Sequence, residues 1–371
     1  RLNAISSSLR PKDPINIQFT SGTTGAPKGA TLTHRNIINN ALSCARAMRL
    51  SYNDVLCIPV PLYHCFGMVL GNLTAVSVGA KMVFPNEGFD AEKTLKALVE
   101  EGCTAVHGVP TMFAAMLESE SFKGKKIKRL RTGIMAGSQC PEPLMRKVLH
   151  QLGCSEITIA YGMTETSPVS FQSDTSDPID VRVATVGRIQ PNCQAKIVDE
   201  KGMPVAIGEP GELIVKGYLV MEGYWGDAEA TKDAIIDGWM YSGDLATIDA
   251  EGFCRIVGRK KDMVIRGGEN IYPVEIEEFL LNIPDIVEAH VFGLPDEKFG
   301  EKLVAWVIVR EGSTINETDL QDICRKDLAY FKVPNKFRFV KEVPLTATGK
   351  PQKFRMRETM LAEQKKNTPI S

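Results

Sequence analysis

The sequence lacks any apolar run of the roughly 18 to 20 residues that a membrane span needs, and the stretch from Val69 to Val83 is broken by glycines and an asparagine. It also lacks net charge, because 44 Lys and Arg are balanced by 45 Asp and Glu. No overall field would therefore draw the chain to nucleic acid or to an anionic membrane surface. We expect a soluble protein with no nucleic-acid partner and no membrane span.

The cysteines lack the patterns of disulfide frameworks and metal sites. All nine are scattered, with no Cys-X-X-Cys pair and no metal-ligand spacing, and several lie in apolar runs such as the one around Cys57. We therefore predict reduced core cysteines in an intracellular protein, in the cytoplasm or the mitochondrial matrix. The chain begins with Arg1 rather than methionine, so a targeting segment could precede it. The sequence does not decide between a monomer and a homo-oligomer.

Two patterns divide the chain. Residues 15–180 alternate short β-rich runs with helical patterns, which indicates βα units around a largely parallel sheet, and short strands with glycine, proline and aspartate turns beyond residue 184 predict a smaller β subdomain. The pattern restarts after a polar segment, residues 258–262, with a helix from Pro273 and strands at residues 289–292 and 303–309. We predict an α/β fold with a large domain over residues 1–260 and a small α+β domain over residues 261–371.

The segment from Thr20 to Gly29 reads Thr-Ser-Gly-Thr-Thr-Gly-Ala-Pro-Lys-Gly, and it follows a predicted strand and precedes a predicted helix that starts near His34. Its glycines permit close approach, so that backbone amides and hydroxyls could surround a phosphate chain while Lys28 adds a positive charge. It is not the nucleotide loop GxxxxGK[ST], because glycine follows the lysine. A solvated linker is the alternative, but a loop held between a strand and a helix favours phosphate binding.

This segment resembles the phosphate-loop signature of the adenylate-forming superfamily, which comprises acyl-CoA synthetases, luciferases and peptide-synthetase adenylation domains. Residues 161–165, 241–245, 258–273 and 344–350 resemble further motifs of that superfamily, in the same order, so the likeness covers almost the whole chain. The stretch from Pro59 to Pro273 is most similar to medium-chain fatty acyl-CoA synthetases.

The resemblance implies ATP, Mg²⁺ and coenzyme A as cofactor and co-substrates. It implies catalytic roles for Lys28, Thr164, Glu165 and Lys350, with Glu165 holding Mg²⁺ and Lys350 acting in adenylation, because carboxylate oxygens suit Mg²⁺ and a flexible ammonium group can reach the reacting oxygens. The residues implied to bind the nucleotide or coenzyme A are Thr20, Ser21, Gly22, Thr23, Thr24, Gly25, Lys28, Gly137, Ser138, Tyr161, Gly162, Asp244, Arg259, Gly267 and Gly268.

His64, Met112 and Ala136 resemble residues of the acyl site, although a lone histidine beside aromatic residues is often a packing residue, so that role stays open for His64. Lys261 corresponds to the family's hinge position. The resemblance therefore implies a mobile C-terminal domain that offers Lys350 in one orientation and the glycine loop at residues 267–268 in the other.

The expected activity is that of an ATP-dependent acyl-CoA synthetase, which joins a carboxylic acid to AMP and then to coenzyme A. The small residues Ala136, Gly137 and Gly162 leave room beside the backbone, which suits an aliphatic chain. An adenylation domain for another acid is one alternative, although the stretch around His64 lacks an acidic anchor for an amino group. A truncated, non-catalytic nucleotide-binding fragment is the other, because only 19 residues precede Thr20 where the family has a large further segment.

Overall fold

The computed structural model describes residues 2–20, 27–122, 124, 126–138, 140–346 and 351–367. The chain divides into two compact units, the first comprising residues 1–242 and 246–256 and the second residues 243–245 and 257–371. Helix α1 (Leu2–Ser8) opens the first unit.

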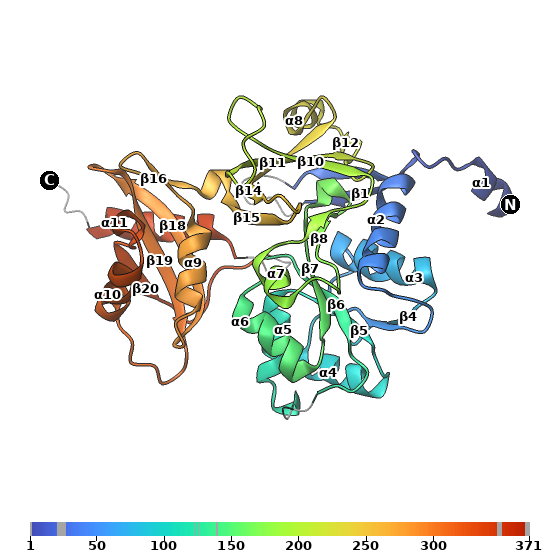
Figure 1. Ribbon diagram of the computed structural model, residues 1–371, viewed down its shortest axis with the longest axis horizontal. Coiled ribbons are helices and arrows are strands. Elements are labelled where there is room, and N and C mark those ends of the chain that lie inside the picture. Colours follow the sequence, from blue (N-terminus) through green and yellow to red (C-terminus); the bar gives the residue numbers. More distant parts are fainter. Residues whose placement is uncertain are drawn as a thin grey trace. The chain divides into compact units, whose positions relative to one another are not determined.

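A seven-stranded sheet in the order β4-β3-β5-β6-β7-β8-β9 dominates the first unit (Figure 1). Strands β3 to β7 are parallel, and β8 and β9 are antiparallel to their neighbours. The predicted parallel sheet of βα units is confirmed, with two antiparallel strands at one edge. The strands are β3 (Val55–Cys57), β4 (Lys81–Val83), β5 (Ala105–Gly108), β6 (Thr132–Ala136), β7 (Glu156–Gly162), β8 (Val169–Gln172) and β9 (Arg188–Ile189).

Helices cover both faces of this sheet (Figure 1). One face carries α2 (His34–Ala47), the π-helix η1 (Phe66–Leu73) and α3 (Thr74–Val78). The other face carries α4 (Ala91–Glu100), α5 (Pro110–Glu118), α6 (Glu142–Lys147) and the π-helix η3 (Val148–Leu152), and the first unit also contains η2 (Glu120–Phe122), η4 (Thr164–Thr166) and α7 (Ile179–Ala184).

The strands are apolar on both faces because each face is buried. Ala105 and Ile134 pack in the core with α2, whereas the next residues along the same strands, Val106 and Met135, pack in the core with α4 and α5. Successive side chains of a strand point to opposite faces, so a sheet covered by helices on both sides needs apolar residues at nearly every position.

Strands β1 (Pro14–Phe19), β2 (Gly29–Thr33) and β12 (Gly223–Tyr224) form a separate antiparallel sheet. The expectation that the segment from Thr20 lies between a strand and a helix is wrong in one respect, because β2 intervenes before α2 and pairs with β1. All five residues of β2 are buried, and its run Gly-Ala-Thr-Leu-Thr alternates apolar with polar residues over four positions, the pattern of a short strand. The loop therefore connects two antiparallel strands.

A five-stranded sheet has the order β10-β11-β14-β13, with β15 beside β14. Its strands are β10 (Cys193–Val198), β11 (Gly211–Gly217), β13 (Ile235–Ile236), β14 (Trp239–Ile248) and β15 (Cys254–Arg259), and α8 (Ala228–Ala234) connects β12 to β13. The β subdomain predicted beyond residue 184 lies here.

The second unit is an α+β structure built on a sheet in the order β17-β16-β19-β18, with β20 beside β19. Pro273 occupies the first turn of α9, where its missing N–H is not needed, as the sequence predicts. The assignment of a domain to residues 261–371 stays a prediction. The elements are η5 (Lys260–Asp262), β16 (Val264–Arg266), β17 (Glu269–Ile271), α9 (Pro273–Leu281), β18 (Ile286–Asp296), β19 (Gly300–Val309), α10 (Glu317–Asp327), η6 (Tyr330–Lys332), β20 (Lys336–Phe339) and α11 (Lys353–Asn367).

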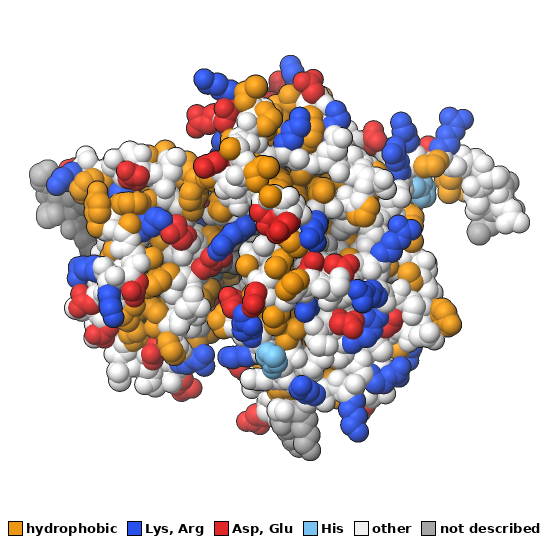
Figure 2. All heavy atoms as spheres, in the orientation of Figure 1, with side chains coloured by type: hydrophobic (Ala, Val, Ile, Leu, Met, Phe, Trp, Pro, Cys, Tyr) orange, Lys and Arg blue, Asp and Glu red, His pale blue; other side chains and the backbone are white. Residues whose placement is uncertain are grey.

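The charges on the surface and the burial of the cysteines match what the sequence predicts. Figure 2 shows basic and acidic side chains interspersed over the visible face. Seven of the nine cysteines are buried, as predicted for core residues, and no disulfide joins any of the nine. Within the described ranges, no helix has the length and apolar character needed to cross a membrane.

Candidate active site

The predicted site residues of the first unit gather at the carboxyl ends of the parallel strands. Met112 lies in α5, just beyond β5, and Ala136 ends β6, with Gly137 and Ser138 following it. Tyr161 and Gly162 end β7. The carboxyl ends of neighbouring parallel strands lie at one edge of the sheet, and ligands of open α/β sheets bind at that edge. The fold therefore brings together residues that are up to 50 positions apart in the sequence.

Glu165 and Lys28 meet at the side chain of Tyr224. The Tyr224 hydroxyl donates a hydrogen bond to Oε1 of Glu165 over 2.8 Å, and Nζ of Lys28 lies 5.0 Å from the centre of the Tyr224 ring. Glu165 is buried, with 7% of its surface exposed, whereas Lys28 is exposed. Burial of Tyr224, followed by the nearby Glu165 carboxylate, raises the pKa of the tyrosine hydroxyl, which stays a hydrogen-bond donor.

Thr164 is connected to the segment that contains His64. The Thr164 hydroxyl lies 3.8 Å from the Cys65 thiol, which in turn lies 3.8 Å from Nδ1 of His64. The backbone N–H of Phe66 donates to this Nδ1 over 3.1 Å. Because Nδ1 accepts that bond, a neutral His64 carries its proton on Nε2. The structure thus brings the predicted acyl-site histidine close to the predicted phosphate-site threonine.

Gly162 is required by the packing of the chain itself. A Cβ atom at this position would lie 1.8 Å from the carbonyl oxygen of Pro168, an approach that no side chain permits. The space beside Gly162 is therefore filled by backbone, and the interpretation that this glycine leaves room for an acyl chain does not hold. The glycine lets β7 and the start of β8 approach each other at the site edge.

The donor set around Glu165 fits a magnesium ion bound together with a nucleotide. Across the part of the chain that the structure describes, no group of three or more His, Cys, Asp and Glu side chains is placed to hold a metal ion. A metal at Glu165 would take its other ligands from phosphate oxygens and water. Mg²⁺ at nucleotide sites is held in this way, by one or two carboxylates and the phosphates.

The second unit contains a further group of predicted residues. Asp244, which is 5% exposed, accepts an ion-paired contact from Nε of Arg259 over 3.0 Å. Lys261 lies in η5, directly after β15. Gly267 and Gly268 form the turn between β16 and β17 with φ angles of +62° and +90°, and nothing lies within 4 Å of the place where a Cβ of Gly268 would be. The turn is therefore open beside the backbone at Gly268, whereas a Cβ at Gly267 would lie 3.4 Å from Cδ1 of Phe299.

Thr20 follows β1, and its hydroxyl accepts a hydrogen bond from the Lys28 backbone over 3.3 Å. Six of the predicted residues lie outside the described ranges, and their roles stay predictions. They are Ser21, Gly22, Thr23, Thr24, Gly25 and Lys350.

Sequence reasoning missed Tyr224 and His107. Tyr224 follows Glu165 by 59 residues, and only the pairing of β12 with β2 places it opposite Ala30, near Lys28. His107 is fully buried, and its Nε2 donates to the Leu70 carbonyl of η1 over 2.9 Å while its Nδ1 accepts from the Ile134 backbone over 3.2 Å. Burial lowers the pKa of His107 to about 4, so the ring is neutral and ties η1 to the sheet.

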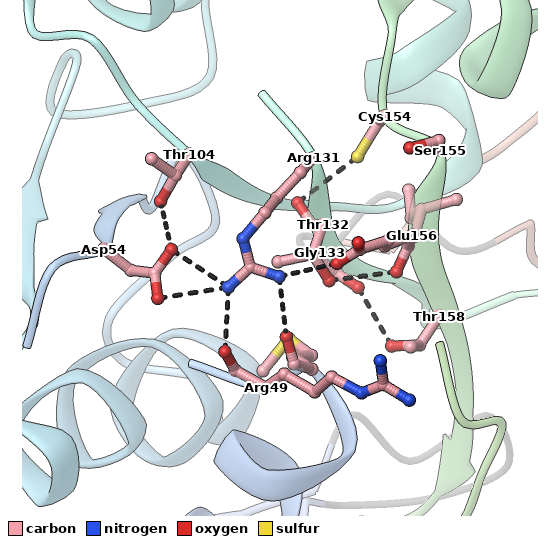
Figure 3. A network of polar contacts seen from close by, with 12 residues as sticks. Arg49, Asp54, Thr104, Arg131, Thr132, Gly133, Cys154, Ser155, Glu156 and Thr158 are labelled. Atoms are coloured by element: carbon pink, nitrogen blue, oxygen red, sulfur yellow. Dashed lines mark hydrogen bonds and ion pairs between the residues drawn. The ribbon is translucent and has the colours of Figure 1, made fainter. Parts of the chain in front are cut away.

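The opposite edge of the sheet contains a network of ionic contacts. Asp54, Thr104 and Arg131 directly precede β3, β5 and β6, and Glu156 begins β7. Figure 3 shows the Arg131 guanidinium between the carboxylates of Asp54 and Glu156, at 3.0 Å and 2.7 Å. This network joins four neighbouring strands at their amino ends, away from the predicted site.

Comparisons with known proteins agree with the motifs. The AMP-binding enzyme family matches residues 3–225, and the AMP-binding enzyme C-terminal domain matches residues 275–350. The chain is 49% identical to YngI of Bacillus subtilis, covering 95% of this chain and 64% of that protein. It is 47% identical to the mitochondrial medium-chain acyl-CoA ligase ACSF2 of Danio rerio, covering 93% of this chain and 58% of that protein.

Among solved structures, ATP-bound MatB from Rhodopseudomonas palustris superimposes with a TM-score of 0.88 at 34% identity, covering 95% of this chain and 69% of that one. The chain spans about three fifths of the length of the two curated relatives. The family match extends over more than half of the chain and includes Lys28 and Glu165 at the carboxyl edge of the sheet. The chain therefore belongs to the AMP-binding enzyme family.

Proposed function

We propose that this chain carries the activity of an ATP-dependent acyl-CoA synthetase. The observation that carries the proposal is the meeting of Glu165 and Lys28 at Tyr224, beside the carboxyl edge of a parallel sheet, in a member of the AMP-binding enzyme family. A carboxylate and an ammonium group that both contact one aromatic side chain are close enough to bind the same polyphosphate, the carboxylate through a metal ion and the ammonium group directly. The relative ACSF2 is named as an acyl-CoA ligase, and MatB has been solved with ATP.

The proposed reaction has two steps. A carboxylate oxygen of the acid attacks the α-phosphorus of ATP, and the bond from that phosphorus to the bridging oxygen of pyrophosphate breaks. The thiolate of coenzyme A then attacks the acyl carbon, and AMP leaves with the carboxylate-derived oxygen. Bound magnesium would neutralise phosphate charge, and Glu165 would hold it there. Lys28 and Thr164 would bind phosphate oxygens, and positioning with charge neutralisation would supply most of the catalysis.

Residues of the second unit would complete the reaction. We propose that Asp244 accepts hydrogen bonds from the ribose hydroxyls, with Arg259 beside it, since the two already pair at 3.0 Å. Lys350 would stabilise charge at the α-phosphate during adenylation. The Gly267–Gly268 turn, which is open at Gly268, would line the path of the thiol arm, and Lys261 would be the hinge between the two orientations.

The proposed acid is a medium-chain fatty acid, with His64, Met112 and Ala136 near the acyl group. The name of ACSF2 supports this length. Tyr161 would contact adenine, and Gly137 and Ser138 would line the nucleotide site. We also propose an intracellular location, supported by seven buried cysteines that form no disulfide.

The test is acid-dependent release of pyrophosphate from ATP and magnesium, measured over fatty acids of increasing chain length, with and without coenzyme A. Lys350→Ala is the test variant, and Lys341→Ala, which removes an exposed lysine nine residues earlier, is its matched control. We expect release that peaks at medium chain length, falls in Lys350→Ala by about 100-fold or more, and persists in Lys341→Ala. Detection of acyl-CoA by mass spectrometry identifies the second step.

Two other outcomes would replace this function. Binding of ATP without acid-dependent release in the wild-type chain would indicate a nucleotide-binding fragment. Release with amino or aromatic acids but not with fatty acids would indicate an adenylating enzyme for another carboxylic acid.

A further inference from the structure

The side chain of Tyr224 touches both charged residues of the phosphate site, Glu165 and Lys28. Its hydroxyl donates to Glu165 over 2.8 Å, and its ring lies under the ammonium group of Lys28 at 5.0 Å. The carboxylate and the ammonium group therefore contact different parts of one side chain. A half-buried aromatic ring with a hydroxyl at its tip can make both contacts at once.

The backbone of Tyr224 is fixed from two sides. In β12 it pairs with Ala30 of β2, and the Trp225 N–H donates to the Gly29 carbonyl over 2.7 Å. The Tyr224 N–H donates to Thr231 Oγ1 in α8 over 2.8 Å. Glu165 is also held through its backbone, since its carbonyl accepts from the Met221 N–H over 2.9 Å. The tyrosine and the carboxylate thus keep their relative position without help from a ligand.

The hydrogen bond occupies Oε1 of Glu165 and so limits rotation of the carboxylate. A carboxylate held at one oxygen presents the other in a fixed direction, which favours a cation in a defined place. Lys28 contacts the face of the ring while Glu165 accepts from its hydroxyl, so each charge has its own contact on Tyr224. A direct ion pair between Lys28 and Glu165 would instead neutralise the charges that phosphate and magnesium need. The phenol holds the anion by a hydrogen bond and the cation by its π face.

We propose that Tyr224 is a positioning residue for magnesium-dependent nucleotide binding, because it orients Glu165 through its hydroxyl and holds Lys28 at the face of its ring. This inference rests on the proposed function for the identity of the ligand. It assigns two separable tasks to two parts of one side chain. Removal of the hydroxyl alone affects the response to magnesium, and removal of the ring also affects the affinity for ATP.

The test is isothermal titration of ATP into the wild-type chain, Tyr224→Phe and Tyr224→Leu over a series of magnesium concentrations. Tyr218→Phe is the matched control, because it removes a tyrosine hydroxyl only six positions earlier in the chain. That hydroxyl lies 3.3 Å from the neutral Ser43 hydroxyl. Thermal unfolding of each variant reports on stability, and acid-dependent pyrophosphate release is measured separately.

In Tyr224→Phe we expect the magnesium concentration for half-maximal ATP binding to rise about 5- to 10-fold, while ATP affinity without magnesium stays within about twofold. Tyr224→Leu weakens magnesium-free binding as well, by about threefold or more. Tyr218→Phe changes neither quantity.

A Tyr224→Phe variant with the magnesium response of the wild type overturns the proposal, as does an equal shift in Tyr218→Phe. Absence of any effect of magnesium on ATP binding to the wild-type chain overturns it too. If magnesium-dependent binding follows the expected order but the wild type releases no pyrophosphate with any acid, the positioning role stands and only the proposed synthetase activity fails.

Discussion

Arg131→Met tests the contribution of the amino-edge network to stability. The Arg131 guanidinium donates to both oxygens of Asp54 at 3.0 and 3.1 Å and to Glu156 at 2.7 Å. It also donates to the carbonyls of Met48 and Arg49, which follow α2. The substitution therefore releases the end of a helix and leaves the Asp54 carboxylate, 7% exposed, without its cation.

The magnitude follows from burial. Removing one partner of a buried ion pair destabilises a protein by about 3–5 kcal/mol, because the other charge stays buried without compensation. Thr104 and the Ser51 N–H still donate to Asp54 in the variant, at 2.7 and 2.8 Å, so we expect the lower end of that range. Glu156→Gln is the matched control, because its side chain is 38% exposed and removal of an exposed charge changes stability by about 1 kcal/mol or less.

The assay is unfolding in urea, monitored by hydrogen exchange in peptides from β5 and β6. Because both strands belong to the first unit, this measurement reports on the unfolding of that unit alone. A free energy of unfolding for Arg131→Met within about 1 kcal/mol of the wild type would refute the reasoning, because a buried, uncompensated carboxylate cannot be that inexpensive. An equal loss in Glu156→Gln would refute it as well, because the effect would then not depend on burial of Asp54.

Three further predictions follow from single positions. Burial raises the pKa of Asp54, but hydrogen bonds from Thr104 and Ser51 and the charge of Arg131 outweigh burial and hold this pKa below its usual range. The difference in unfolding free energy between wild type and Asp54→Asn is therefore full above about pH 4 and shrinks as the pH falls further. A difference that is unchanged at about pH 3 contradicts this. Because its pKa is lowered to about 4, His107 binds no proton in the folded state until the pH is well below its unfolded pKa of 6.5. The first unit therefore loses about 3 kcal/mol of unfolding free energy as the pH falls from 6.5 to 4. In urea titrations, His107→Gln removes this pH dependence. Gly162→Ala destabilises the first unit by about 3 kcal/mol or more, because the added Cβ meets the Pro168 carbonyl. Gly88→Ala is the control and changes stability by about 1 kcal/mol or less, because nothing lies within 4 Å of its added Cβ. Similar melting temperatures for the two variants would rule out the packing explanation.

The main sheet could be predicted because its local signals agree with its tertiary structure. Helix α4 starts at a local signal, because Asp90 is its N-cap and the Asp90 side chain accepts from the Lys93 N–H. The helix expected at Pro273 begins there. In both cases one residue type carries a local physical preference that the surrounding structure does not override.

The sequence was less informative where tertiary pairing decides the structure. Strand β2 alternates apolar and polar residues over only four positions, from Ala30 to Thr33, directly before α2, and its pairing with β1 and β12 identifies it as a strand. Tyr224 belongs to a two-residue strand within a glycine-rich turn, a setting that indicates a loop. Its contact with Glu165 spans 59 residues, and no spacing rule predicts such a contact.

The two edges of the parallel sheet carry different properties of the protein. Strands β5, β6 and β7 begin in the network around Arg131 and end next to predicted site residues. Strand β6, for example, starts directly after Arg131 and ends at Ala136. A strand is stiff along its length and packed on both faces here, so the network can hold the strand ends in place without touching a ligand. Variants of Arg131 should therefore lower stability while leaving the magnesium dependence of ATP binding in the folded protein unchanged. Tyr224→Phe should do the opposite, and a pair of variants that affected both quantities together would mean that the two edges are not independent.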